Sequence, residues 1–232
     1  MTWLTDPDIW TALLQILAID ILLGGDNAVV IAMACRRLPV EKRQKAIWGG
    51  MAGAIALRIV LLFFAMELLA LPWLKLVGAV LLLWVGIKLI GAHEDDDATI
   101  DGGVRLITAI RTIVVADAVM SLDNVVAVAA AGEGNLLLVS AGVLISIPVI
   151  VLGSRLVLAM MDRFPSVVLF GGALIGWIAG GMAIADPALR HWLVPVQPWE
   201  HYLASAAGAA LVLLLGLAMA RYRARQLRSE AR

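Results

Sequence analysis

The chain has 232 residues, of which 62% are hydrophobic and 16% are charged, and its formal net charge is zero. Soluble domains contain about 45–50% apolar and about 25% charged residues, so this composition excludes an ordinary soluble protein and favours a membrane protein. The zero net charge gives no indication of a nucleic-acid partner. The single cysteine, Cys35, excludes an internal disulfide.

Seven apolar stretches are each long enough to cross a bilayer as a helix, which takes about 20 residues. We expect transmembrane helices at residues 8–35, 45–71, 73–92, 104–131, 136–161, 166–186 and 201–222. These runs are too long for strands of an outer-membrane barrel, which need about 10 alternating residues each. The first residues lack the basic segment of a signal peptide, so we expect the first helix to be retained. The predicted fold is an all-α polytopic membrane bundle in which 1–232 form one domain.

The distribution of Lys and Arg predicts the orientation of the bundle, because short cytoplasmic loops carry an excess of these residues. Five basic residues lie in or beside the loop after the first helix, between residues 36 and 45, and five arginines follow position 220. The loop at 132–135 has no basic residue. Seven helices with this distribution place the N-terminus outside and the C-terminus in the cytoplasm.

One polar motif, with the pattern Asp-x5-Asp-Asn, occurs in the first predicted helix and again in the fourth. Its two copies are Asp20, Asp26 and Asn27, and, 97 residues later, Asp117, Asp123 and Asn124. The same offset relates Arg58 in the second helix to Arg155 in the fifth. Because each repeating unit contains three helices, an odd number, its two copies must be inverted relative to each other in the membrane. We therefore predict inverted three-helix repeats at 8–92 and 104–186, followed by an extra helix at 201–222.

The spacing within the first copy predicts a break in its helix. On an unbroken helix, Asp20 and Asp26 would lie about 120° apart around the axis and about 9 Å along it, too far to share one small ion. Gly24 and Gly25 permit an unwound turn that would free carbonyl oxygens for a cation. Asp26 would then stand at the start of a second half-helix as an N-cap-type residue. The second copy has Ser121 and a leucine at these positions, which leaves open whether its helix is broken.

The two copies together would supply four carboxylates, two amides and the freed carbonyls. Such oxygen ligands suit Mg²⁺, Ca²⁺ or Mn²⁺ better than Cu⁺ or Zn²⁺. Arg58 and Arg155 would offset part of the negative charge and leave about two charges for a divalent cation, either as structural ion-pair partners or as gating residues. Protonation of a buried aspartate could instead couple transport to protons. A purely structural network that holds helices together is the alternative for the whole motif.

These motifs give the chain a resemblance to a known family. Gly24-Gly25-Asp26-Asn27-Ala-Val-Val and Ser121-Leu-Asp123-Asn124-Val-Val-Ala, each with its upstream aspartate, resemble the TerC family of integral membrane proteins, within the wider group of LysE-like exporters. The resemblance covers essentially residues 8–186. It implies metal-ion homeostasis, Mn²⁺ export as the activity of several members, and a bacterial inner membrane. The motif acids that it carries over are Asp20, Asp26, Asp117 and Asp123. The short chain departs from those members that carry an appended cytoplasmic domain.

The function that we predict is export of a divalent cation, with Mn²⁺ favoured and Ca²⁺ or Mg²⁺ as alternatives, through a site at the membrane midplane. A non-transporting metal sensor, or an accessory protein that supplies metal to others, is the competing hypothesis. An intramembrane aspartyl hydrolase would need Gly-x-Gly-Asp, which Leu23-Gly-Gly-Asp does not provide, so no enzymatic activity is predicted. There is no nucleotide-binding loop. The direction of transport, a homo-oligomeric state and the role of the last helix stay open.

Overall fold

The computed structural model describes residues 7–64, 68, 71–91, 102–131, 136–191 and 197–230. All regular secondary structure in these residues is helical, as predicted. The elements are α1 (Pro7–Leu23), α2 (Gly25–Cys35), α3 (Val40–Phe63), α5 (Leu74–Gly91), α6 (Gly102–Ala131), α7 (Leu136–Arg163), α8 (Ser166–Ile184), the short 3-10 helix η3 (Pro187–His191) and α9 (Pro198–Glu230).

Five helices in the described part, α3, α5, α7, α8 and α9, are long and apolar enough to cross a membrane. The bent pair α1–α2 makes six if the two segments form one span. The chain is therefore a polytopic helical membrane protein, whereas the count of seven spans and the orientation of the termini stay predictions.

Charged residues extend several helices beyond their predicted ends. The helix predicted to begin at 45 begins at Val40, directly after Pro39, because Glu41 in its first turn suits the positive end of the helix dipole. That helix ends at Phe63 rather than at 71. The last helix, predicted for 201–222, runs from Pro198 to Glu230 because arginine and glutamine are good helix formers.

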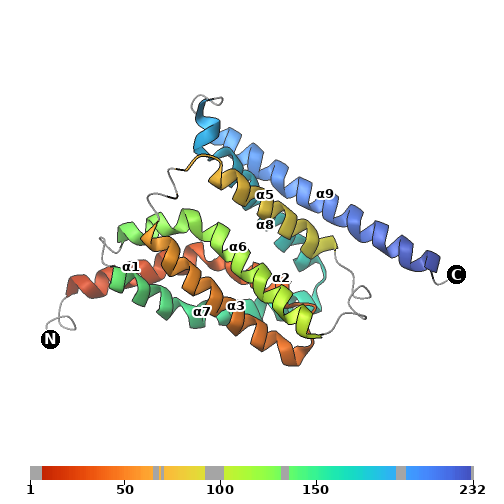
Figure 1. Ribbon diagram of the computed structural model, residues 1–232, viewed down its shortest axis with the longest axis horizontal. Helices are drawn as coiled ribbons and strands as arrows, with labels where there is room; N and C mark the ends of the chain where they lie inside the picture. The colour runs from red at the N-terminus through yellow and green to blue at the C-terminus, as the bar shows by residue number, and fades with distance from the viewer. Residues whose placement is uncertain are drawn as a thin grey trace.

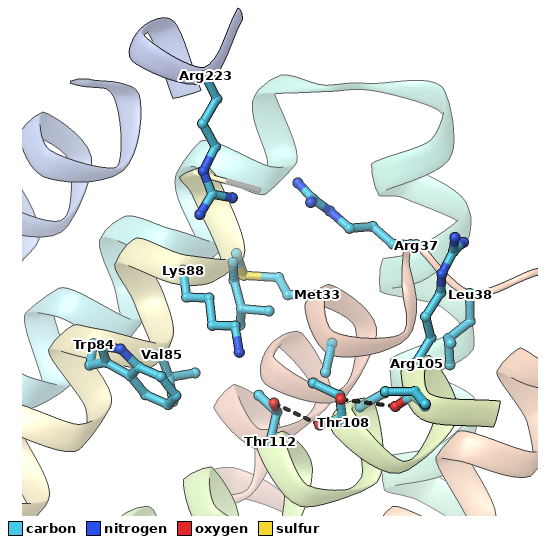
Figure 2. Close-up of a pocket in the computed structure, with 14 residues that line it drawn as sticks. Met33, Arg37, Leu38, Trp84, Val85, Lys88, Arg105, Thr108, Thr112 and Arg223 are labelled. Carbon is cyan, nitrogen blue, oxygen red and sulfur yellow. Dashed lines mark hydrogen bonds between the residues drawn. The ribbon is translucent and has the colours of Figure 1, made fainter. Parts of the chain in front are cut away.

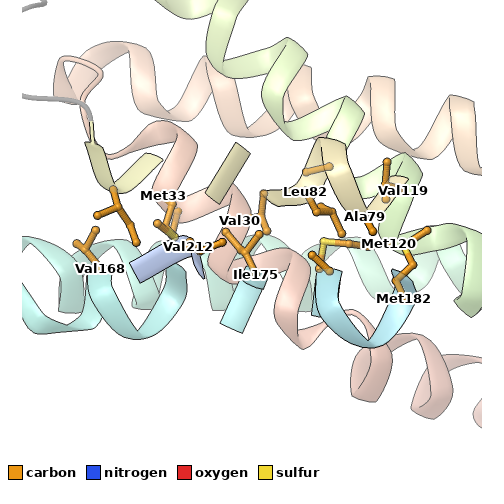
Figure 3. Packing of buried hydrophobic residues seen from close by; sticks show 14 of the residues in the cluster. Val30, Met33, Ala79, Leu82, Val119, Met120, Val168, Ile175, Met182 and Val212 are labelled. Atoms are coloured by element: carbon orange, nitrogen blue, oxygen red, sulfur yellow. The ribbon is translucent and has the colours of Figure 1, made fainter. Parts of the chain in front are cut away.

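The helices run back and forth along the long axis of the molecule, with the N-terminus and the C-terminus at opposite ends (Figure 1). Helices α5, α8 and α9 pack against one another, and α1, α2, α3, α6 and α7 form a second group. One hydrophobic cluster joins the two groups. Figure 3 shows it, with Val30 of α2, Leu82 of α5, Val119 of α6, Ile175 of α8 and Val212 of α9.

Helices from the first half of the chain pack against helices from the second half. Helix α3 packs on α6, and α7 packs on α1 and α2. In Figure 1, α3 and α6 run in one direction, whereas α7 and the α1–α2 pair run in the other. Two inverted repeats would produce both the packing between the halves and the opposite directions of the helices. We interpret both features in this way.

Helix α9 packs closely on α8 through glycines, which accounts for the position of the last helix. A Cβ atom on Gly176 would lie 2.5 Å from the carbonyl oxygen of Gly208, and one on Gly180 would collide with the carbonyl of Ala204. Small residues let two backbones approach in this way, which is a common basis of helix association in membranes. The last helix is thus tied to the bundle by backbone contact.

Candidate functional site

The first motif copy lies at a break between two helices, as its glycines predict. Helix α1 ends at Leu23 and α2 begins at Gly25, and the two axes differ by 47°. A Cβ atom on Gly24 would lie 2.5 Å from the carbonyl oxygen of Asp20, whereas one on Gly25 would meet nothing within 4 Å. Gly24 is therefore the glycine that the break requires.

Asp26 does not cap α2, contrary to the sequence-based expectation. Gly24 occupies the cap position, and Asp26 lies in the first turn of the helix, where its Oδ1 accepts the N–H of Asn27 at 2.8 Å. A carboxylate in the first turn is favoured by the helix dipole. Asp26 is half-buried and close enough to Asp117 and Arg58 to interact with both electrostatically.

Four helices, α1, α3, α6 and α7, bring together a buried cluster centred on Arg58, which we call the Arg58 cluster: Asp20, Arg58, Asp117, Ser121 and Ser146. The Arg58 guanidinium donates to Asp20 of α1 and to Asp117 of α6, each at 2.7 Å, and its Nε donates to the Ser121 hydroxyl at 3.0 Å. The hydroxyl of Ser121 donates to Asp117 at 3.2 Å, and that of Ser146, on α7, donates to Asp20.

The Arg58 cluster is almost completely removed from solvent. Asp20, Arg58 and Asp117 are 2%, 6% and 5% exposed. A guanidinium bridging two carboxylates satisfies both with charge-assisted hydrogen bonds, yet the formal charges sum to minus one. With both carboxylates ionised, the cluster carries an excess of negative charge inside an otherwise apolar bundle, and protonation of one of them would neutralise it.

Arg58 forms ion pairs with Asp20 and Asp117, but Arg155, its equivalent at the 97-residue offset, does not join the cluster. Arg155 is exposed on α7, whereas Ser146 of the same helix reaches Asp20. Both carboxylates already accept hydrogen bonds from the Arg58 guanidinium, so they do not require a second arginine as a donor. Ser146 is the site residue that sequence reasoning missed, and its only signal is a hydroxyl in an apolar helix, where it commonly bonds to a neighbouring helix.

The two asparagines of the motif differ in their surroundings. Asn124 of α6 donates to the carbonyl oxygen of Leu23, the last residue of α1, at 3.4 Å, so the second copy contacts the break in the first. Asn27 is 2% exposed, and neither its Nδ2 nor its Oδ1 has a hydrogen-bond partner. A buried amide without partners costs free energy, which a bound ligand could recover.

The second copy does not break its helix, because α6 is continuous from Gly102 to Ala131. Ser121, at the position equivalent to Gly24, has a side chain that bonds within the Arg58 cluster. Asp123 belongs to the same helix, and its side chain lies outside the described part of the structure.

The described carboxylates of the predicted pool are not assembled around an open cavity. Among the described residues, no three His, Cys, Asp or Glu side chains are grouped so that they could hold a metal ion. Arg58 instead occupies the place between Asp20 and Asp117. The adjacent cavity, lined by both Asp20 and Asn124, has a volume of about 10 Å³, which is near the minimum for one water molecule.

Spanning helices around a buried charge cluster define a polytopic integral membrane protein. The model of the integral membrane protein TerC family matches residues 5–227, and the chain therefore belongs to the TerC family. Its location in the bacterial inner membrane follows from this membership and from relatives described as inner membrane proteins.

Several bacterial relatives are similar over most of their length. The uncharacterized membrane protein YjbE of Bacillus subtilis is 44% identical over 184 residues, which cover 79% of this chain and 84% of that protein. The inner membrane protein YgdQ of Escherichia coli is 29% identical, over 71% of this chain and 76% of that protein. YceF of Bacillus subtilis is 30% identical, over 78% and 73%. No solved structure matches the chain.

Proposed function

We propose that this protein exports a divalent metal cation, with Mn²⁺ favoured, through a site between the α1–α2 break and α6. Membership of a family of integral membrane proteins supports a role in the membrane. Ionisable residues inside spanning helices are costly and usually mark an ion pathway. The observation that carries the proposal is the buried, unpartnered amide of Asn27 beside Asp26 at a helix break.

In this proposal, Arg58 and the metal ion compete for the same carboxylates. The guanidinium compensates Asp20 and Asp117 when no cation is bound. A divalent cation would bring the additional positive charge that the cluster lacks, and the Arg58 side chain would move away as it enters. A cavity of about 10 Å³ admits no hydrated ion, so entry requires rearrangement of the helices. Movement of one repeat against the other around a midplane site would supply this rearrangement. Exchange of the metal ion for protons moving in the opposite direction would be compatible with such a movement.

Uptake of Mn²⁺ into proteoliposomes that contain the purified protein tests the proposal. We expect Asp26→Asn and Asn27→Leu to lower the flux about tenfold or more, as loss of groups at a metal site commonly does. Asn27→Leu also separates function from structure, because removing an unpartnered buried amide should leave the free energy of unfolding unchanged or raise it. Ser154→Ala is the control, because that buried hydroxyl donates to Val151 of its own helix.

Two results would contradict transport through this site. Wild-type flux in both variants would exclude a role for Asp26 and Asn27. Saturable Mn²⁺ binding to the wild-type protein without any flux would instead favour the competing hypothesis of a metal sensor or accessory protein.

A further inference from the structure

A larger cavity lies at one end of the bundle, away from the Arg58 cluster. It has a volume of about 510 Å³ and is lined by 14 residues from α2 and the turn after it, α5, α6 and α9. Four of these residues are basic, namely Arg37, Lys88, Arg105 and Arg223, and none of the fourteen is acidic. We call this cavity the basic pocket.

The four cations come from four different parts of the chain and converge on one space. Figure 2 shows Arg223 of α9 and Arg37 of the turn after α2 pointing toward each other across the basic pocket, with Lys88 of α5 and Arg105 of α6 along its sides. An anion in the basic pocket would interact favourably with the positive charges that line it. A guanidinium has five N–H donors, so an arginine that also contacts protein groups can still donate to a phosphate.

The remaining wall of the basic pocket is mostly apolar. Met33, Leu38 and Val85 line it, together with Trp84 and Val104, each of which is 55% exposed. The Lys88 ammonium lies 4.9 Å from the centre of the Trp84 ring. The hydroxyls of Thr108 and Thr112, which also line it, donate to carbonyls of their own helix, and Figure 2 draws these bonds. Cationic and exposed apolar groups side by side match a ligand with a charged head and a hydrocarbon body.

The position of the basic pocket fits the head-group region of a bilayer. It lies where α2 and α5 end, where α6 begins and where the arginine-rich part of α9 passes. Basic pockets between membrane helices, near their cytoplasmic ends, are suited to anionic head groups. A small free anion would interact with the cations of the basic pocket but would not cover the exposed side chains of Trp84 and Val104.

We propose that the basic pocket binds an anionic phospholipid, whose phosphate lies among Arg37, Lys88, Arg105 and Arg223 and whose acyl chains lie along Trp84 and Val104. The lipid would join α5 and α9 to α2 and α6, and so connect the two helix groups. The proposal does not depend on which ion the protein carries.

Native mass spectrometry of the full-length protein in mild detergent, titrated with phosphatidylglycerol, tests this site. We expect one preferred phosphatidylglycerol molecule per chain, and binding on the order of thirty-fold weaker in Lys88→Gln/Arg223→Gln, because two basic side chains are lost. The double variant Arg221→Gln/Arg225→Gln removes the same charge from exposed positions of α9 outside the pocket, and should bind like the wild type. Lys88→Arg/Arg223→Lys should restore binding and exclude misfolding as the cause.

Three outcomes would overturn the proposal. Equal weakening in the two glutamine double variants would indicate attraction by general surface charge. Equal binding of phosphatidylcholine would show that the anionic head group is not recognised. Protection against thermal unfolding by inorganic phosphate, equal to that given by phosphatidylglycerol, would identify a site for a free anion rather than for a lipid.

Discussion

Arg58 is the residue on which the charges of the Arg58 cluster depend. Its guanidinium bonds to two carboxylates on two helices, at 2.7 Å each, and is itself 6% exposed. Removing one partner of a buried ion pair costs about 3–5 kcal/mol, because the remaining charge is left without compensation. Lysine cannot replace it, because a single ammonium lacks the planar fork that reaches both carboxylates.

Replacement of Arg58 should therefore destabilise the protein far more than replacement of its sequence equivalent. We expect Arg58→Gln to lower the free energy of unfolding in detergent by about 3–5 kcal/mol, and Arg155→Gln, at an exposed position, to change it by less than about 0.5 kcal/mol. Chemical denaturation monitored by circular dichroism measures both. Similar losses in the two variants would contradict the central role of Arg58.

Adding Mn²⁺ tests whether Arg58 competes with the metal ion or acts only as an ion-pair partner. If the metal and Arg58 compete for Asp20 and Asp117, Mn²⁺ should raise the melting temperature of Arg58→Gln more than that of the wild type, because ligand binding stabilises the folded state. Mg²⁺ at the same concentration is the control for ionic strength and ion type. An equal shift in both proteins would leave Arg58 as a structural counter-ion alone.

At the scale of the elements, the break between α1 and α2 depends on one glycine of the pair. A side chain at Gly24 would collide with the carbonyl of Asp20, whereas Gly25 faces open space. We expect Gly24→Ala to distort the break and to lower Mn²⁺ flux and stability, and Gly25→Ala to leave both near wild type. The collision with backbone should cost roughly 1–3 kcal/mol, as overpacking usually does. A larger effect of Gly25→Ala would place the critical turn elsewhere.

A second contact between elements joins the end of α8 to the start of α5. Asp186 is fully buried and accepts the N–H groups of Trp73 and Leu76 at 2.9 Å and of Ala188 at 2.7 Å. Trp73 has a φ of 71°, a left-handed conformation that is costly for a residue with a side chain, and the bond to Asp186 helps to hold it. Burial opposes ionisation of Asp186, but these N–H donors outweigh it and hold the pKa of the carboxyl below 3.8.

The lowered pKa of Asp186 gives the protein a defined acid sensitivity. The ionised carboxylate stabilises the folded state at pH values above about 4, the ordinary pKa, and its contribution is lost as the pH falls through the lowered pKa of the folded protein. Asp186→Asn should lower the free energy of unfolding at pH 7 by about 1–3 kcal/mol. It should also reduce the loss of stability on acidification below pH 4. Parallel pH profiles for the two proteins would contradict this.

The sequence alone predicted the features that depend on local chemistry. Paired glycines predicted the break at Gly24, and the polar motif predicted the buried positions of Asp20 and Asp117. The sequence did not predict which face of α7 points inward, so Ser146 rather than Arg155 reaches the cluster. That rotation depends on the packing of whole helices, which the 97-residue offset does not determine.

At the scale of the whole molecule, basic residues that are unrelated in the sequence line a single cavity. In the sequence, Arg37 and Arg223 belong to loops and tails that indicate orientation, and Lys88 lies near a helix end. Only the tertiary arrangement places them around the basic pocket. The basic pocket could not be predicted because its residues are distant in the chain and share no motif.

The orientation of the whole bundle can be tested with cysteines at its two ends. Gln44 near the start of α3 and Gln197 before α9 are both exposed, and these helices start at opposite ends of the molecule (Figure 1). The single native cysteine, Cys35, is fully buried, so it should contribute little background labelling.

Because basic residues cluster at the end that holds Gln44, the positive-inside rule places this end in the cytoplasm. A membrane-impermeant maleimide on intact spheroplasts should label Gln197→Cys and spare Gln44→Cys until the cells are lysed. Labelling of Gln44→Cys alone would reverse the orientation, and labelling of both in sealed cells would contradict a bundle whose ends lie on opposite sides of the membrane.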